Sequence, residues 1–163
     1  MDVLIRNALE KDLSSINSIY NYYVECSTCT FQIKAETIED RKKWFIDHKE
    51  GYPVIVAELD NEIIGWASLS GFHKREAYKP TVENSVYVKA DKTGIGIGSL
   101  LLEELIKRAR SYNYHSIIAG ISADQKASIN LHKKFKFKKA ALLREVGNKF
   151  NKFLDVAYYQ LML

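Results

Sequence analysis

VYVKADKTGIGIGSLLLEELIKRA, the stretch from Val86 to Ala109, contains a short apolar run, a loop with three glycines and a segment with helical periodicity. The glycines, Gly94, Gly96 and Gly98, occupy alternate positions. Glycine has no Cβ atom and adopts positive φ readily, so another group can approach the backbone of such a loop closely. The open N–H groups at the start of a helix favour an anion such as a phosphate. A tight turn between strand and helix, without any ligand, explains the glycine spacing equally well.

The two common nucleotide-binding motifs do not match this loop. A Walker A loop places Lys-Ser or Lys-Thr directly after its last glycine, whereas Gly98 is followed by Ser99 and Leu100. A dinucleotide-binding loop has the spacing G-x-G-x-x-G near the start of a βαβ unit. The glycines here come late in the chain, after segments with the pattern of antiparallel strands. A phosphate held by this loop would therefore be bound in another setting.

The rest of the chain mixes strand and helix patterns. Period-two alternation predicts strands over residues 3–6, 53–59, 62–70, 81–88 and 116–121. Two further strands, 140–146 and 153–163, form a predicted hairpin with Gly147-Asn148 between them. Helical periodicity predicts helices from Leu13, from Thr37, and over residues 97–109 and 127–134. The expectation is one mixed α/β domain that spans residues 1–163.

Two short signals set element boundaries within this pattern. Asp60-Asn61 lies between two predicted strands, and both residue types tolerate the positive φ of a tight hairpin turn. Thr37 can cap the first turn of a helix, and Asp40 follows three residues later, which makes a variant of the capping box.

Composition indicates an ordinary soluble globular chain. The 163 residues suffice for one domain with a core, and 47% of them are hydrophobic and 27% charged. The net charge of +4 is weak support for a nucleic-acid partner, and we expect none. We find no apolar run long enough to span a membrane and no signal-peptide pattern at the N-terminus, so we expect a cytoplasmic protein with no membrane partner. A solvated face or attraction for a polyanionic ligand explains the basic cluster Lys133, Lys134, Lys136, Lys138 and Lys139.

The sequence gives no local pattern for a metal site. Cys26 and Cys29 form one C-x-x-C, but a zinc site needs four ligands and no second pair follows. The four histidines are scattered along the chain. We therefore expect two ordinary reduced thiols and no metal.

Several motifs in order resemble one family. The loop Thr93–Gly98 resembles the Q/R-x-x-G-x-G/A loop of the GNAT superfamily of acetyl-CoA-dependent N-acetyltransferases, with Thr93 in place of Gln or Arg. Four other segments resemble the phosphinothricin and methionine-sulfoximine acetyltransferase subfamily, and the resemblance covers nearly the whole chain. They are YVECSTCTF (23–31), REAYKPTVENSVYV (75–88), AGISADQKASINLH (119–132) and VGNKFNKFLDVAYYQLML (146–163). The departures are Gln125 in place of Asn, and Lys136 in place of Gly before Phe137, which suggests a changed turn.

The resemblance implies both a fold and a coenzyme site. The fold is a central, mostly antiparallel sheet of about seven strands flanked by about four helices. The co-substrate is acetyl-CoA, with its pyrophosphate held by the loop amides and its pantetheine arm by the backbone of the preceding strand. The implied coenzyme-binding residues are Val86, Tyr87, Val88, Thr93, Gly94, Ile95, Gly96, Ile97, Gly98, Ser99 and Gln125.

Acetyl transfer to an amine requires removal of a proton from the amine and stabilisation of the leaving thiolate. Strand alternation places Glu83, Ser85 and Tyr87 on one face of the strand 81–88. The resemblance makes Glu83 the catalytic base, directly or through a water, where a solvent-facing charge is the alternative. It also implies that His132 lies near the coenzyme sulfur, where a structural surface histidine is the alternative.

The resemblance places the basic loop before this strand over the substrate pocket. An arginine can clamp a carboxylate by two parallel hydrogen bonds, which suits an amino-acid substrate. A solvated basic loop is the alternative interpretation. The implied substrate-binding residues are His73, Lys74, Arg75, Tyr78, Glu83, Asn84 and Ser85.

The resulting hypothesis is acetylation of the α-amine of a small amino-acid analogue by direct transfer in a ternary complex. Methionine sulfoximine, methionine sulfone and phosphinothricin are the candidate substrates. The alternatives are a GNAT enzyme that acts on protein N-termini or polyamines, and a non-catalytic acyl-CoA-binding regulatory module. The subfamily resemblance implies a homodimer. It also implies that the enzyme binds a small-molecule amine as its substrate.

Overall fold

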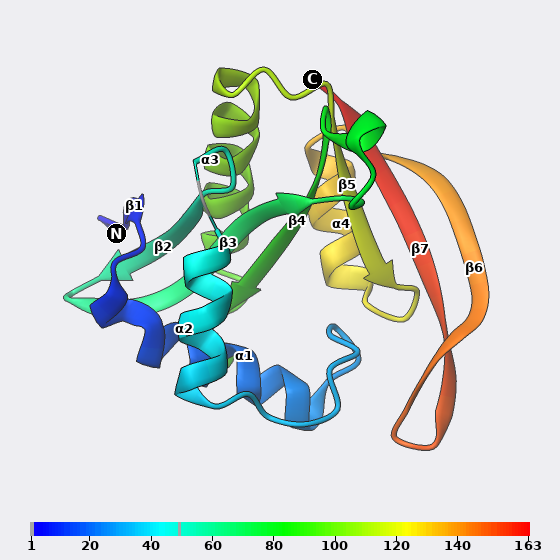
Figure 1. The fold of residues 1–163 in the computed structure, drawn as a ribbon. Coiled ribbons are helices and arrows are strands. Elements are labelled where there is room, and N and C mark those ends of the chain that lie inside the picture. Colours follow the sequence, from blue (N-terminus) through cyan, green and yellow to red (C-terminus); the bar gives the residue numbers. More distant parts are fainter. Residues whose placement is uncertain (1, 49) are drawn as a thin grey trace.

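The computed structural model describes residues 2–48 and 50–163. Seven strands form one sheet in the order β1-β2-β3-β4-β5-β7-β6 (Figure 1). Neighbouring strands are antiparallel except for β4 and β5, which are parallel. The expected mostly antiparallel sheet is therefore confirmed. The strands are β1 (Leu4–Asn7), β2 (Val54–Leu59), β3 (Glu62–Gly71), β4 (Thr81–Val88), β5 (Ser116–Ser122), β6 (Lys138–Lys149) and β7 (Lys152–Met162).

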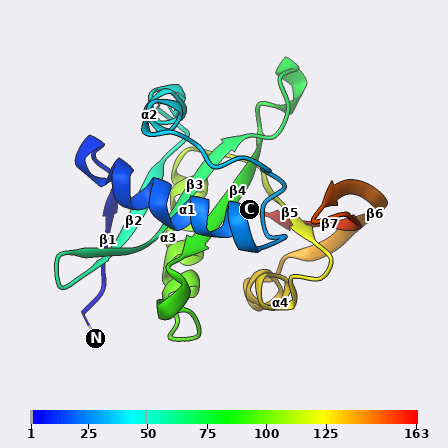
Figure 2. The ribbon, with the colours of Figure 1, turned by 90° about the horizontal axis from the view of Figure 1, so that it is seen from below.

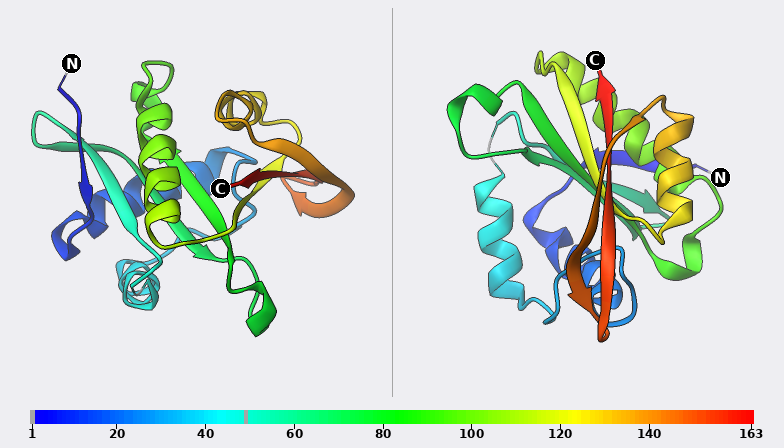
Figure 3. Two further views of the ribbon diagram at one scale, coloured as in Figure 1. Left: turned by 90° about the horizontal axis from the view of Figure 1, so that it is seen from above. Right: turned by 90° about the vertical axis from the view of Figure 1, so that its right-hand side faces the viewer.

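Within residues 2–48 and 50–163, four α-helices cover the two faces of the sheet, as expected. Helices α1 (Leu13–Cys26) and α2 (Ile38–Asp47) pack on one face, and α3 (Ile97–Ser111) and α4 (Lys126–Lys134) lie on the other (Figures 2 and 3). None of the helices in the described residues is long and apolar enough to cross a membrane.

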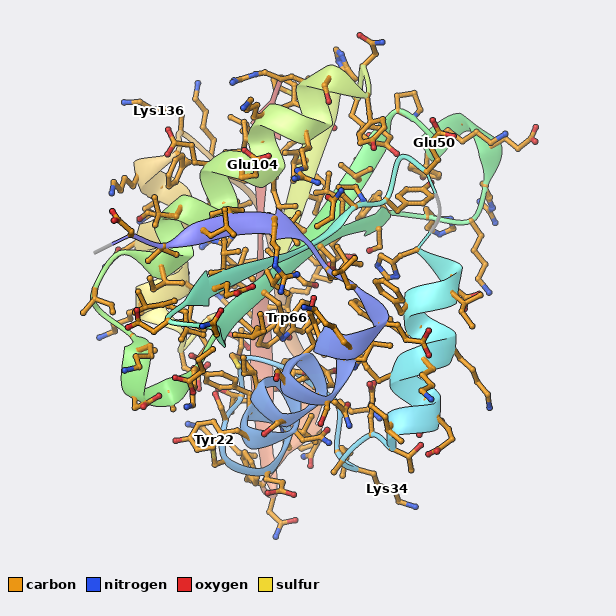
Figure 4. All side chains as sticks on the ribbon, turned by 90° about the vertical axis from the view of Figure 1, so that its left-hand side faces the viewer. Tyr22, Lys34, Glu50, Trp66, Glu104 and Lys136 are labelled. Carbon is orange, nitrogen blue, oxygen red and sulfur yellow. The ribbon has the colours of Figure 1, made fainter. Side chains whose placement is uncertain are left out.

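Each face of the sheet has its own hydrophobic core. Leu101, Leu102 and Leu105 of α3 are fully buried against alternate side chains of β2 to β5. On the other face, Trp66 packs between the sheet and helices α1 and α2 (Figure 4). The alternation expected in β4 is confirmed, because its valines join the α3 core and Tyr87 joins the Trp66 cluster. Residues on the two faces of β4 therefore meet different sets of elements.

The two boundary signals are confirmed by their geometry. The Thr37 hydroxyl accepts a hydrogen bond from the Asp40 N–H at 3.1 Å, and the Asp40 carboxylate accepts one from the Thr37 N–H at 3.1 Å. Asp60 and Asn61 adopt φ of 50° and 63° between β2 and β3, as a two-residue hairpin turn requires.

The final hairpin turns three residues later than expected. Gly147 and Asn148 lie within β6, and the turn consists of Phe150 and Asn151 with φ of 53° and 56°. The prediction of a turn at Gly147-Asn148 was wrong because this glycine serves a close approach. A Cβ atom at Gly147 would lie only 2.2 Å from Cε2 of Phe31.

Candidate active site

The site begins where two neighbouring strands separate. β4 pairs with β5 only from Thr81 to Glu83, whereas its pairing with β3 continues to Val88. Beyond Glu83 the two strands diverge toward the bottom of Figure 1. A cavity of about 790 Å³ occupies the gap and is lined by both strands, the starts of α3 and α4, and the loop after α1.

The cavity collects most of the residues expected at the site. It is lined by the expected residues Glu83, Asn84, Ser85, Val86, Tyr87, Val88, Thr93, Gly94, Gly96, Ile97, Gly98, Ser99, Gln125 and His132. Ile95 is not among the lining residues, and its side chain is half exposed in the glycine loop. The cavity therefore unites segments that are far apart in the chain.

Glu83 lies on the face of β4 that carries α1. Its backbone pairs with Ile118, and a Cβ atom on the neighbouring Gly120 would lie 3.2 Å from its Oε1. Burial raises the pKa of the Glu83 carboxyl above its ordinary value. None of the hydrogen bonds or ion pairs between described residues satisfies this carboxylate. A carboxylate that is desolvated and unpaired inside a cavity has the properties of a general base.

The glycine loop presents open backbone on the opposite side of the cavity. Gly94 and Gly96 have φ of 79° and 96°, and no atom of the described chain lies within 4 Å of a Cβ placed on either residue. Helix α3 starts directly afterwards, and its first hydrogen bond runs from the Ser99 N–H to the Gly96 carbonyl at 3.0 Å. The preceding N–H groups have no intrahelical partner, so they can bind an anion.

The third glycine of the loop has a different role. A Cβ atom on Gly98 would lie 3.3 Å from Cδ2 of Leu131, so this glycine lets α3 and α4 pack closely. Two lysines add positive charge near the open amides. Lys92 lines the cavity, and the Lys134 ammonium donates a hydrogen bond to the Ser99 hydroxyl at 3.3 Å. This arrangement fits a diphosphate despite the absence of Gln or Arg at Thr93.

His132 is buried, which rules out the surface histidine considered from the sequence. Its Nδ1 lies 2.8 Å from the Ser128 carbonyl, so Nδ1 carries the proton and donates. Its Nε2 lies 2.9 Å from the Asn84 side-chain nitrogen, so Nε2 accepts. Burial lowers the pKa of the imidazole, which favours this neutral form. Asn84 thus faces α4, on the opposite side of β4 from Glu83.

The backbone of β4 is only partly free to bind a ligand. The Tyr23 hydroxyl donates a hydrogen bond to the Val88 carbonyl at 2.6 Å. Burial raises the pKa of Tyr23 to about 12, which keeps this hydroxyl protonated as a donor. The Tyr87 ring stacks on Trp66 with a centroid distance of 4.8 Å. The side chain of Tyr87 therefore serves the core while its backbone lines the cavity.

The basic loop between β3 and β4 lies apart from the cavity in this chain. His73, Lys74, Arg75 and Tyr78 are exposed, and none of them is among the lining residues. Their recorded contacts are within the loop, such as the His73 and Tyr78 rings at 4.8 Å. The expected substrate residues thus fall into two groups, of which only Glu83, Asn84 and Ser85 reach the cavity.

Sequence reasoning missed one segment of the wall. Thr28, Cys29 and Thr30, in the loop after α1, line the cavity together with Phe31. The segment YVECSTCTF is one of those that resemble the subfamily, but nothing in it indicated the contact between Thr28 and Asp124, in the loop between β5 and α4. Cys26 and Cys29 are both free thiols. Within the described residues, no group of three or more His, Cys, Asp or Glu side chains comes together as a metal site would require.

Comparison with known proteins matches this geometry. The model of the acetyltransferase (GNAT) domain matches residues 5–157. The L-methionine sulfoximine/L-methionine sulfone acetyltransferase of Pseudomonas aeruginosa is 37% identical over 100% of this chain and 96% of its own length. The phosphinothricin N-acetyltransferase of Streptomyces coelicolor is 36% identical over 98% of this chain and 95% of its own length.

A solved structure shows the same fold. The phosphinothricin acetyltransferase of Sinorhizobium meliloti, determined in complex with acetyl-CoA, superposes with a TM-score of 0.96 at 32% identity. The match covers 100% of this chain and 89% of that one. The splayed strands, the open glycine loop and the partly buried carboxylate are thus found in a chain that belongs to the GNAT acetyltransferase family and is an N-acetyltransferase of that family.

Proposed function

We propose that the protein transfers the acetyl group of acetyl-CoA to the α-amine of a small amino-acid analogue of the methionine sulfoximine, methionine sulfone or phosphinothricin type. The observation that carries the proposal is the placement of Glu83 and His132 on opposite faces of β4, at the point where β4 and β5 separate. An amine can then approach from one face of the strand while a thiolate departs on the other. The relatives named above support the choice of substrate class.

The residues of the chain divide the reaction between them. The amides of Gly94 to Gly98 would hold the coenzyme diphosphate, assisted by Lys92 and Lys134. Bound acetyl-CoA supplies an acyl group that is activated as a thioester. Glu83 accepts a proton from the substrate ammonium, directly or through one water, so that the nitrogen regains its lone pair. The nitrogen then bonds to the acetyl carbon and the bond from carbon to sulfur breaks. The nitrogen gives up its second proton and the departing sulfur takes up a proton, so the products are the amide and a free thiol.

His132 serves the leaving group under a structural constraint. With Nδ1–H held by Ser128 and Nε2 occupied by Asn84, the neutral ring has no free proton to donate. Protonation of the thiolate by His132 requires a proton on Nε2 and rotation of the Asn84 amide. In that state the Asn84 oxygen, which is buried and has no hydrogen-bond partner in the described structure, would accept from Nε2–H. The pair can therefore exist in two hydrogen-bonding states.

The proposal also covers the assembly and location of the enzyme. A homodimer is supported by the apolar side chains that the terminal hairpin exposes, which are Leu142, Leu143, Val146 and Phe153. Arg75 lies outside the cavity of this chain, so we do not assign it to the substrate carboxylate. A cytoplasmic location is proposed because both thiols are free.

A panel assay tests the function. Thiol release from acetyl-CoA is measured with the three analogues, with an amine that matches methionine sulfoximine but lacks its carboxylate, with a polyamine and with a peptide that has a free N-terminus. The proposal expects turnover with an analogue and a much lower kcat/KM without the carboxylate. Faster turnover of the polyamine or the peptide would contradict it, and coenzyme binding without turnover on any amine would favour a binding module.

A further inference from the structure

The loop after α1, residues 27–31, forms one wall of the cavity, and we call it the α1 loop. Thr28, Cys29, Thr30 and Phe31 from this loop line the cavity. The loop lies next to the tip of the β6–β7 hairpin (Figure 3). Because it follows α1, it lies on the face of β4 that carries Glu83. Its position therefore sets the space available to an acceptor amine.

Lys149, near the tip of β6, ties this loop to the hairpin. Its ammonium donates to the carbonyls of Ser27 at 2.7 Å, Thr30 at 2.8 Å and Tyr23 at 3.4 Å. A lysine ammonium has three N–H donors, so these three carbonyls use all of them. Lys149 therefore cannot bind a substrate carboxylate without releasing a carbonyl of the loop or of α1.

The lysine is an uncommon choice for such a position. Only 4% of Lys149 is exposed, and none of the ion pairs between described residues includes it. Burial lowers the pKa of its ammonium. A buried cation without a carboxylate is costly unless dipoles replace the lost water. Here the dipoles are the carbonyls of Tyr23 and Ser27 at the C-terminal end of α1, where the helix dipole is negative, and the carbonyl of Thr30 in the loop that follows.

Contacts at two further places hold the same loop. Phe31 packs where Gly147 of β6 has no Cβ. At the other edge of the cavity, the Thr28 hydroxyl lies 2.8 and 2.9 Å from the two carboxylate oxygens of Asp124, and the Gln125 amide donates to Thr28 at 2.7 Å. The α1 loop is thus tied to β6 on one side and to the loop before α4 on the other.

We propose that Lys149 is a positioning residue that holds the α1 loop closed over the cavity and so fixes the acceptor side of the site. It acts through the loop and does not touch the reacting atoms. Its catalytic consequence rests on the proposed function, whereas closure of the loop does not.

The first experiment measures closure without any substrate. Replacement of Cys26 by Ser leaves Cys29 as the only cysteine of the chain, and its rate of reaction with a maleimide reports opening of the loop. In this background Lys149→Met keeps the length of the side chain but removes the ammonium. Because that ammonium lowers the pKa of the Cys29 thiol, each rate is divided by the thiolate fraction obtained from its own pH dependence. We expect labelling to accelerate about tenfold or more, because a hydrogen-bonded charge is lost. Lys138→Met, an exposed lysine of the same strand, is the matched control and should leave the rate unchanged.

The second experiment separates positioning from general loss of structure. For Lys149→Met we expect KM for the analogue that the parent turns over to rise about tenfold. The Kd of acetyl-CoA should stay within about twofold, because the glycine loop proposed to bind it lies on the other side of the cavity. If Lys149→Met does not fold, Lys149→Gln is measured in the same way. Unchanged labelling in a folded variant, an equal rise of KM and Kd, or failure of both variants to fold would overturn the proposal. Accelerated labelling with no activity in the parent would contradict the proposed function alone.

Discussion

The two walls of the cavity are built by different means. The wall proposed to bind the coenzyme, which we call the coenzyme wall, consists mainly of backbone from one short segment, Gly94 to Gly98, at the start of α3. The wall proposed to face the acceptor amine, which we call the acceptor wall, consists of side chains of the α1 loop and Glu83 from β4. That loop is held by Lys149, which is 122 residues from Ser27 in the sequence. Backbone amides suit a diphosphate, which is the same in every catalytic cycle. Substitutions in a wall of side chains can alter which substrate binds without altering coenzyme binding.

Mutations in the two walls should affect different kinetic constants. Changes in the coenzyme wall should alter the affinity for acetyl-CoA, and changes in the acceptor wall should alter turnover or the KM of the amine. A change in the coenzyme wall that altered only turnover of the amine, or a change in the acceptor wall that altered only the affinity for acetyl-CoA, would contradict this division.

The largest expected effect belongs to the acceptor wall. Glu83→Gln keeps the shape of the side chain but removes the proton acceptor. We expect kcat to fall by about 10²–10⁴-fold, the usual range for general acid–base catalysis. The Kd of acetyl-CoA, measured by titration calorimetry, should stay within about twofold. Activity within a few-fold of the parent at neutral pH would place the base elsewhere.

The matching change in the coenzyme wall is Gly96→Val. The φ of 96° at this residue strains a β-branched side chain, and the added atoms would fill the open space over the amides. We expect the Kd of acetyl-CoA to rise about tenfold or more, because a strained backbone costs on the order of 1–3 kcal/mol. Leu100→Val, on an exposed position of α3, is the control for folding. Unchanged affinity in a folded Gly96→Val protein would reduce the loop to a simple turn.

A smaller effect is expected where the walls meet, at the hydrogen bond between Asn84 and His132. His132→Phe should slow turnover about tenfold and spare coenzyme affinity, because the neutral ring contributes less than a formal base. Asn84→Asp should raise the pKa of His132, since a carboxylate favours the imidazolium. An NMR titration of the histidine measures this shift, and an unchanged pKa would refute the pairing.

The smallest expected effect lies behind the coenzyme wall, at the end of α4. Lys136 adopts a φ of 70°, in the left-handed region that glycine adopts readily. Lys136→Gly should raise the free energy of unfolding by about 0.5–1 kcal/mol, because a left-handed lysine is strained. Asn113→Gly, at a φ of 59°, should raise the free energy of unfolding by a smaller amount, because asparagine tolerates the left-handed region better than lysine does. Urea unfolding of the two variants makes the comparison, and destabilisation by Lys136→Gly would contradict it.

The sequence predicted local features better than distant ones. The capping box at Thr37 and the turn at Asp60-Asn61 follow from residues within a few positions of each other, and both are present. The glycine loop could be located for the same reason. The alternation that separates Glu83 from Val82 depends only on the period of a strand.

Features set by tertiary contacts could not be located in this way. Gly147 resembles a turn residue, but its role depends on Phe31, more than a hundred residues earlier. The part of the α1 loop in the cavity wall depends on hydrogen bonds to Lys149 and Asp124. Arg41 is fully buried, with its guanidinium 4.6 Å and 4.5 Å from the ring centroids of Tyr20 and Trp44, and no local pattern indicates that.

The pH dependence of kcat/KM, in the parent and in Glu83→Gln, tests most directly whether Glu83 is the base. Partial burial raises the pKa of the Glu83 carboxyl, and the group acts as a base only when ionised, so activity of the parent should rise with pH through this raised pKa. In the variant no base remains, so activity should instead follow the free amine and rise only toward the pKa of the substrate amine. The loss caused by the substitution should therefore shrink as the pH increases. A variant that keeps the acid limb of the parent, at any level of activity, would contradict the assignment of Glu83 as the base.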